Sequence, residues 1–572
     1  MAPTLVPGRR RSVPRDLSIV IASAMVPCSV SGCLERVTGG LVPQRRSWMV
    51  ALVMGVMAHV TTAMAGVGQA PSRQWGGLAA GPYAVGFRLA GEYDRSRRVA
   101  PTTDFEGRPN AGPHAMSMQV AIWYPATRPR AVRPMQYGEL AAISAKRTDL
   151  ATPTTADRVA AIESMRSFSG FAFGRQLAES LYRIVDTTST AAFRDAPSVP
   201  RRFPALLVAT DGSLASASVL FEYLASHGIV VMATPSRSSY GTIQVSRPAA
   251  VVEARVRDLE YLVDRASRMP NVDTARIAVL GVNFDGMAAL AFQMKNMAAR
   301  AVVSLDGWEG KRNSIATMQA NLHFDPRRLR VPYLVIEQDE ATPSPALTLD
   351  RTIFDSFRYS DRQWLVLTAM SHAYLIGNPL VHPSVPPEKR QAYELLARSV
   401  HRLLDAALAE PPRRLASLVT AEASTDGGSP LVKDIVRADA RPAVPDDAEL
   451  ERLIMVDRAV DKVATILREA RQSDSTFVLF PQGTMALYAF RFTRMNDLPF
   501  AVRLMELNAE AFPRSWSAAD ALGNGYRDSG DSMRAIAAYA RAIALLAGSS
   551  SDSAPVARTR QSIESKLAQL RR

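Results

Sequence analysis

The sequence predicts an α/β domain built on a mostly parallel sheet, followed by an all-α domain of paired helices. The first observation is the alternation of short apolar segments with helix-like segments between residues 84 and 408. That order is typical of a parallel sheet with helices on both faces. The second is a stretch rich in Pro, Ala and Ser over 411–445, which predicts a linker. The third is a helical pattern that repeats beyond the linker.

Composition and charge set the broad class of the protein. A chain of 572 residues with 47% apolar and 21% charged residues predicts two or three globular domains. The formal charge is +14, but residues 1–65 hold seven Arg and two acids and so contribute +5 of it. The remaining positive charges are dispersed, which argues against nucleic-acid binding. Both cysteines, Cys28 and Cys33, lie before residue 66, so the rest of the chain has no disulfide or thiol chemistry.

Residues 1–65 have the features of a leader with an export signal. Two arginines precede an apolar run from Val50 to Met64, and Ala63-Met64-Ala65 matches an A-x-A cleavage site. The run is shorter than the ~20 residues of a membrane span. We therefore predict cleavage after Ala65 and an exported protein, periplasmic or secreted. An upstream segment offers an alternative, a lipoprotein signal with Cys33 as the lipid-bearing residue.

The α/β domain is predicted over residues 80–410. Its predicted strands are 84–93, 118–124, 205–209, 229–234, 276–281, 301–305, 333–337 and 364–367, and its predicted helices are 216–226, 249–268, 286–296, 347–357 and 389–408. Ligands of such a sheet bind at the carboxyl ends of the strands. We therefore expect the functional residues directly after strands.

The carboxyl-terminal region, residues 446–572, has the pattern of a helical repeat. Tyr488 and Phe492 in one unit correspond to Leu522 and Tyr526 in the next, 34 positions later (522 − 488 and 526 − 492). This spacing resembles the tetratricopeptide repeat, in which neighbouring helix pairs interlock. An unrelated helical bundle is the alternative. A preceding helix is predicted over 449–470 and a terminal cap over 556–570. We expect these helices to bind a protein partner.

One strand–turn–helix stretch, residues 276–290, carries the features of a nucleophile elbow. Such elbows read G-x-S-x-G and hold the nucleophile above the end of a parallel strand. The corresponding residues here are Gly281, Val282, Asn283, Phe284 and Asp285, so Asn283 occupies the serine position. Elbow residues have a positive φ, which Asn tolerates better than most residues. Asn283 therefore preserves the turn.

Three other segments follow predicted strands and complete a candidate site. The loop ending at Ser213 follows the first core strand, where a backbone donor to an oxyanion is expected. Asp306 follows the strand after the elbow, and His372 follows the last strand. The order nucleophile, acid, histidine is the one expected for an α/β-hydrolase. Asp339, after the next strand, is the alternative acid. The seven histidines have no paired spacing and no phosphate loop follows a strand, so we predict no metal and no cofactor.

Together these segments resemble the platelet-activating-factor acetylhydrolases and the bacterial dienelactone-hydrolase-like enzymes. The resemblance covers about residues 80–408 and rests on 81–88, 120–126, 224–231, the elbow, 305–308 and His372. It implies an α/β-hydrolase-type mostly parallel sheet and a cofactor-free Ser-His-Asp ester hydrolase. Carried over by position, Asp306 would orient His372 and His372 would act as base. The amides of Ser213 and Phe284 would form the oxyanion hole.

The departures from that family lie at the reacting atoms. Asn283 has no hydroxyl, and a carboxamide cannot replace it as a nucleophile. Asp285 stands where the family has Gly, and we expect its carboxylate to crowd and repel a developing oxyanion. A role for Asp285 as the nucleophile is an alternative that needs a two-residue shift in register.

Two functions follow from these observations. The first is a pseudoenzyme: an impaired or non-catalytic hydrolase fold that binds a small ester or acyl ligand in its cleft and a protein partner through its repeats. The second is an active esterase or acyl hydrolase of small esters. It would use His372 and Asp306 with an unrecognised nucleophile, such as a water held by His372.

Overall fold

The computed structural model describes most of the chain after the leader. The described residues are 75–99, 114–145, 150, 152–173, 175–210, 214–215, 217–235, 248–339, 345–368, 370–375, 385–413, 431–547 and 554–572. The predicted leader, with Cys33 and Ala65, lies outside them, and so does Ser213. Among the described helices, none combines the length and apolar character that crossing a membrane requires.

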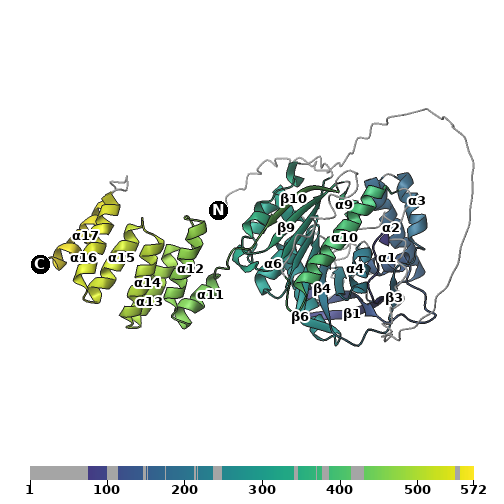
Figure 1. The fold of residues 1–572 in the computed structure, drawn as a ribbon, viewed down its shortest axis with the longest axis horizontal. Coiled ribbons are helices and arrows are strands. Elements are labelled where there is room, and N and C mark those ends of the chain that lie inside the picture. Colours follow the sequence, from purple (N-terminus) through teal and green to yellow (C-terminus); the bar gives the residue numbers. More distant parts are fainter. Residues whose placement is uncertain are drawn as a thin grey trace, which may run out of the picture.

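The described strands form a ten-stranded sheet in the order β10-β9-β8-β7-β6-β4-β5-β2-β1-β3 (Figure 1). They are β1 (Ala84–Val99), β2 (His114–Ala126), β3 (Ala192–Arg194), β4 (Phe203–Thr210), β5 (Val230–Pro235), β6 (Val272–Val282), β7 (Val302–Leu305), β8 (Tyr333–Gln338), β9 (Arg362–Leu367) and β10 (Val432–Ala438). Neighbouring strands from β5 across to β9 run parallel, whereas the pairs β5–β2, β2–β1 and β9–β10 are antiparallel. The strand order reverses between β4 and β6, and ligands of open α/β sheets bind at such switch points.

Helices cover both faces of the sheet, as the sequence predicts. Those of the sheet domain are α1 (Tyr137–Ala145), α2 (Thr155–Phe173), α3 (Arg175–Val185), α4 (Ser218–Ser226), α5 (Pro248–Ser267), α6 (Asp285–Asn296), α7 (Ile315–Gln319), α8 (Thr352–Ser356), α9 (His372–Leu375) and α10 (Pro387–Ala407). One core joins α4 and α10 to one face, and a second core joins α5 and α6 to the other. Alternate residues of β4 divide between them: Leu206 belongs to the first core and Leu207 to the second. Strands buried on both faces read as continuous apolar runs, which is why these were predictable.

The structure corrects the predicted linker at its carboxyl-terminal part. Residues 432–438 form β10, which pairs antiparallel with β9 and completes that edge of the sheet. Composition concealed this strand because it is an edge strand with Lys433, Asp434 and Arg437 among its residues, and charged side chains are common at exposed edges. The helix predicted over 347–357 is also shorter, with α8 limited to Thr352–Ser356.

The carboxyl-terminal helices stack in chain order as an array (Figure 1). They are α11 (Asp447–Glu451), α12 (Val460–Ser473), α13 (Gln482–Arg494), α14 (Leu498–Ala511), α15 (Trp516–Asp528), α16 (Ser532–Ala547) and α17 (Ala554–Leu570). Two helix pairs, α13–α14 and α15–α16, repeat at the predicted spacing. Gly523 on α15 is required for close packing against α16, since a Cβ there would lie 2.6 Å from the Tyr539 ring.

The helix predicted over 449–470 is broken into two. Arg458 has a φ of +54°, which ends one helical segment and begins α12. Its guanidinium lies 4.0 Å from the centre of the Phe500 ring and pairs with Asp497. These contacts come from α14 and its N-cap, so the sequence around Arg458 contains no sign of the break.

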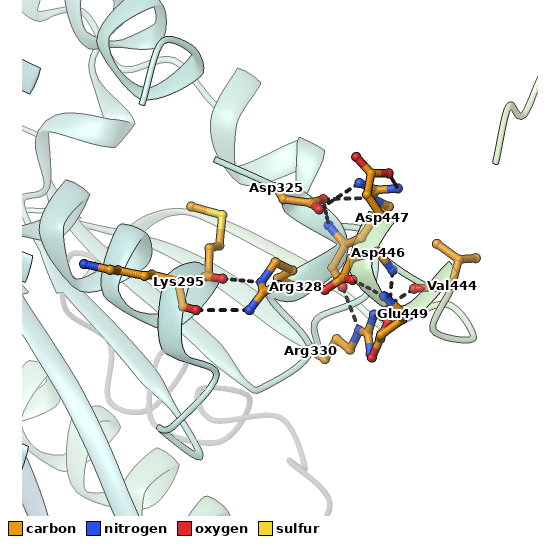
Figure 2. A network of polar contacts seen from close by, with 10 residues as sticks. Lys295, Asp325, Arg328, Arg330, Val444, Asp446, Asp447 and Glu449 are labelled. Carbon is orange, nitrogen blue, oxygen red and sulfur yellow. Dashed lines mark hydrogen bonds and ion pairs between the residues drawn. The ribbon is translucent and has the colours of Figure 1, made fainter. Parts of the chain in front are cut away.

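An arginine cluster attaches the array to the sheet domain (Figure 2). Arg328 donates to Asp446 at 2.8 Å, and Arg330 donates to both carboxylate oxygens of Glu449 at 2.9 and 2.6 Å. Asp446 and Glu449 also form the capping box of α11, so the same carboxylates start the helix and bind the sheet domain. Arg330 precedes β8. The array is therefore attached near the amino end of a strand whose carboxyl end lies beside the candidate site.

Candidate active site

The turn after β6 has the backbone of a nucleophile elbow. Asn283 has a φ of +58°, the left-handed conformation that the sequence predicts for this position. A Cβ at Gly281 would lie 2.1 Å from the carbonyl oxygen of Asp285, so this glycine is required for the sharp turn. Helix α6 then leaves at Asp285. Asn283 stands at the carboxyl end of β6, beside the switch point of the sheet.

Backbone hydrogen bonds join this elbow to the turn that carries Asp306. The amide of Asn283 donates to the carbonyl of Leu305 at 3.0 Å, and the amide of Trp308 donates to the carbonyl of Asn283 at 3.1 Å. Asp306 itself has a φ of +50° and donates its amide to Ile336 at 2.7 Å. The two turns are thus held at fixed positions relative to one another.

The structure brings the predicted acid and the predicted base together. Oδ2 of Asp306 lies 2.6 Å from Nδ1 of His372. The Asp306 side chain is 6% exposed, whereas that of His372 is 43% exposed. Burial alone would raise the pKa of Asp306, but the bond to His372 and the charge of Lys311 outweigh it, so that pKa lies below its ordinary value. Asp306 is therefore ionised, which fixes the Nδ1–H tautomer of a neutral His372.

Asp339, the alternative acid, is placed differently. It lies 4.0 Å from Nζ of Lys433 on β10, and a quarter of its side chain is exposed. The geometry thus favours Asp306 over Asp339 as the residue that orients His372.

A lysine that the sequence reasoning missed completes the surroundings of Asp306. Nζ of Lys311 lies 2.7 Å from Oδ1 of Asp306 and 2.5 Å from Oε2 of Glu337. Lys311 is 6% exposed and Glu337 is fully buried. Burial raises the pKa of Glu337 well above its ordinary value against the opposing charge of Lys311. A lysine five positions after Asp306, between two 3₁₀ turns, carries no sequence signal for this contact, which the fold alone creates.

The side chain of Asp285 does not face the predicted oxyanion position, so that expectation was wrong. Asp285 is 1% exposed, and its Oδ1 lies 3.1 Å from Nε of Arg255 on α5. The ion pairs continue inward: Arg255 lies 3.9 Å from Asp258, which lies 2.6 Å from Arg97. Asp285 therefore joins the elbow to α5 and, through Arg97, to β1. This arrangement also removes the basis for Asp285 as a shifted nucleophile.

The close packing that the second glycine of an elbow normally provides occurs one residue later, at Gly286. A Cβ there would lie 2.3 Å from Oε2 of Glu309 and 2.4 Å from Oγ of Ser304. Glu309 is 2% exposed and accepts a hydrogen bond from the Tyr333 hydroxyl at 2.9 Å. Burial raises the pKa of Glu309. The buried Glu309 side chain thus packs closely against Gly286, directly after the elbow.

Of the two predicted oxyanion donors, the structure describes one. Phe284 is the N-cap of α6, so its amide lies at a helix start, where backbone N–H groups lack intrahelical acceptors. Its ring packs edge-on against Trp308, with ring centres 5.4 Å apart. Ser213 lies outside the described residues.

Taken together, the turn, the acid and the histidine are arranged as expected for an acyl-transfer site, but without the hydroxyl that would attack. A half-exposed imidazole held by a buried carboxylate can accept a proton from a bound group or a water. Asn283 contributes a carboxamide, which donates and accepts hydrogen bonds. Among the described residues, no three His, Cys, Asp or Glu side chains are grouped as a metal site would require.

Comparisons with known proteins point to esterases. The chain is 26% identical over 179 residues to cutinase 2 of Thermobifida cellulosilytica, a match that spans 31% of this chain and 58% of that enzyme. Cutinase cut1 of Thermobifida fusca matches at 26% over 179 residues and 48% of its length. The chain thus spans about half the length of these curated relatives. No protein-family model matches.

The described sheet is mostly parallel and is followed by an all-α region, as the fold class predicted from the sequence requires. A ferulic acid esterase from Streptomyces cinnamoneus aligns over 59% of this chain and 94% of its own, at 19% identity and a TM-score of 0.39. The finer resemblance to acetylhydrolases, and that of the helical array to tetratricopeptide repeats, stay predictions.

Proposed function

We propose that this protein is exported and that its α/β-hydrolase domain binds a small ester or acyl ligand. The domain does not turn this ligand over by serine-type catalysis. The observation that carries the proposal is Asn283, which holds the positive φ of the elbow without supplying a nucleophile. The groups around it, Asp306 and His372, remain paired at 2.6 Å. The site therefore keeps the acid and the base and lacks the group that would attack a carbonyl carbon.

The test compares binding with turnover. Saturation-transfer NMR with short-chain esters should show binding to the exported protein, while p-nitrophenyl ester hydrolysis stays at the level of a His372→Ala variant. Serine-directed fluorophosphonate should not label the protein at Asn283. Absence of ester or acyl binding would overturn this proposal.

A second candidate function is hydrolysis by a water that His372 activates. The favouring observation is the ionised, buried Asp306 beside a half-exposed imidazole, since strongly perturbed acids beside a histidine gather at catalytic sites. Ester hydrolysis that is lost in both His372→Ala and Asp306→Asn would establish this function in place of the first.

We propose that the helical array binds a protein partner through the exposed face of α13. Leu487 and Phe490 on this face, and Met495 at the C-cap of α13, are 50%, 60% and 66% exposed. Arg491 and Arg494 lie among them, neither with an ion-pair partner among the described residues, and no acid occurs between residues 474 and 497. An acidic segment with apolar side chains would complement this surface.

The partner surface has a matched control within the array. Phage-displayed peptides selected on the full protein should converge on acidic, apolar sequences. Their binding should be lost in Phe490→Glu and kept in Met533→Glu, because Met533 is 84% exposed on α16 and away from α13. Equal loss in both variants would reject α13 as the surface.

A further inference from the structure

Lys311 stands out because it places a buried cation on the acid of the site. Asp306 has two carboxylate oxygens, and the structure assigns a different partner to each: His372 at Oδ2 and Lys311 at Oδ1, at 2.6 and 2.7 Å. Nζ of Lys311 is held from the other side by Glu337 at 2.5 Å. All these groups except the imidazole are nearly or fully buried.

We propose that Lys311 is a positioning residue of the site, which holds Asp306 with Oδ2 toward His372 and keeps the imidazole neutral at physiological pH. This proposal rests on the proposed function only in taking His372 as the group that faces the ligand. A neutral imidazole with its proton on Nδ1 presents Nε2 as a hydrogen-bond acceptor. A ligand that carries a hydroxyl or an amide N–H can then donate a hydrogen bond to His372.

The physical reason is the charge that His372 experiences. An aspartate alone beside a histidine stabilises the imidazolium and raises its proton affinity. Here the positive charge of Lys311 on the same carboxylate opposes that effect in a poorly screened interior. Glu337 does not restore a second negative charge, since burial favours its protonated form. The cluster thus supports a hydrogen bond to His372 more than it supports a charged imidazole.

The titratable groups that face this cluster come from several elements. Glu309 interacts with Lys311 from the turn after β7, and Tyr333 faces Glu309 and Glu337 from β8. Burial, and then the proximity of Glu309 and Glu337, raises the pKa of Tyr333 well above its ordinary value, so it stays neutral. Apart from Asp306 itself, Lys311 is therefore the charged group of this cluster that acts on His372.

The test is an NMR titration of the His372 imidazole in the full exported protein, with the resonance assigned by its loss in His372→Gln. In Lys311→Met the pKa of His372 should rise by about one unit, a tenfold gain in proton affinity. The control is Glu337→Gln, which removes an acid from the same cluster and should leave that pKa unchanged or lower it. If Lys311 had only a structural role, the pKa of His372 would not differ between the two variants in this way.

An unchanged or lowered His372 pKa in Lys311→Met would overturn the proposal, and so would an equal rise in Glu337→Gln. If Lys311→Met does not fold, Lys311→Met/Glu337→Met is compared with Glu337→Met, and the same rise is expected. The titration does not depend on ester binding or hydrolysis. Failure of the proposed function and failure of this inference are thus separately visible.

Discussion

Oδ1 of Asp285 lies 3.1 Å from Nε of Arg255, inside the protein and two residues from Asn283. This ion pair changes what the elbow requires. The carboxylate that replaces an expected glycine is part of the internal structure and does not obstruct the site. Restoring a serine at position 283 therefore needs no change at position 285.

Asn283→Ser alone should create serine-type reactivity. The new hydroxyl would stand at the elbow, with Asp306 and His372 already paired. We expect fluorophosphonate labelling and short-chain ester hydrolysis above the level of the unmodified protein. Adding His372→Ala should lower the labelling rate by about 10²-fold or more, the usual contribution of a general base. A folded Asn283→Ser protein that never labels would mean that the site has decayed beyond its nucleophile.

Asp285→Gly should destabilise the protein and not improve that rescue. It leaves Arg255, which is 1% exposed, with one fewer anionic partner in the interior. Removal of one member of a buried ion pair costs about 3–5 kcal/mol. Urea unfolding of Asp285→Gly and of Asp264→Gly, an exposed acid on α5 as control, measures the difference. A rescue by Asn283→Ser/Asp285→Gly greater than that by Asn283→Ser would contradict the observed orientation of Asp285.

Glu222 should make stability depend on pH between about 4.5 and 7. It lies on α4 and accepts hydrogen bonds from Trp75 at 3.2 Å and the Ala191 amide at 2.8 Å. Burial raises its pKa from 4.5 to about 7. The folded state thus binds its proton more tightly than the unfolded state. This contribution is complete below pH 4.5 and is lost as pH rises through 7.

The measurement compares unfolding free energies of the unmodified protein and Glu222→Gln across that range. Their difference should change by about 3 kcal/mol, because one pKa unit corresponds to about 1.4 kcal/mol. Asp264→Asn, at an exposed acid on α5, serves as the control. A constant difference for Glu222→Gln would mean that Glu222 is not held protonated by its surroundings.

Two glycine-to-alanine changes should have opposite effects on the free energy of unfolding. Gly286→Ala places a Cβ 2.3 Å from Oε2 of the buried Glu309, and such overpacking costs typically about 1–3 kcal/mol. Gly483→Ala on α13 meets nothing within 4 Å and gains helix propensity, up to about 1 kcal/mol. Thermal unfolding of the two variants tests the pair. Stabilisation by Gly286→Ala would show that the elbow is less closely packed than described.

The boundary of the sheet domain can be tested with two truncated chains. A chain that ends at residue 445 keeps β10 paired with β9 and should be monodisperse and stable. A chain that ends at residue 410 loses β10 and exposes the edge of β9, and it should aggregate. Size-exclusion chromatography compares them. If both truncated chains are equally monodisperse, residues 411–445 act as the linker that composition predicted.

Much of this architecture could be read from the sequence because its signals are local. Apolar runs such as Leu334–Ile336 are buried on both faces of the sheet, so they identify their strands without reference to partners. The elbow was predictable for a similar reason, since Gly281 and Asn283 occupy backbone positions that few other residue types tolerate. The order of acid and histidine likewise followed from their places after strands.

Tertiary structure alone decided the surroundings of each functional side chain. Asp285, Lys311 and Glu337 acquire their roles from partners on other elements, namely Arg255 on α5, Asp306 after β7 and Lys311 in the following turn. β10 likewise exists as a strand only because β9 supplies its hydrogen-bond partners. Periodicity and backbone preference are properties of a short segment of chain, and a sequence displays them directly. Ion pairing and edge pairing depend on distances between residues far apart in the chain, which only the folded protein fixes.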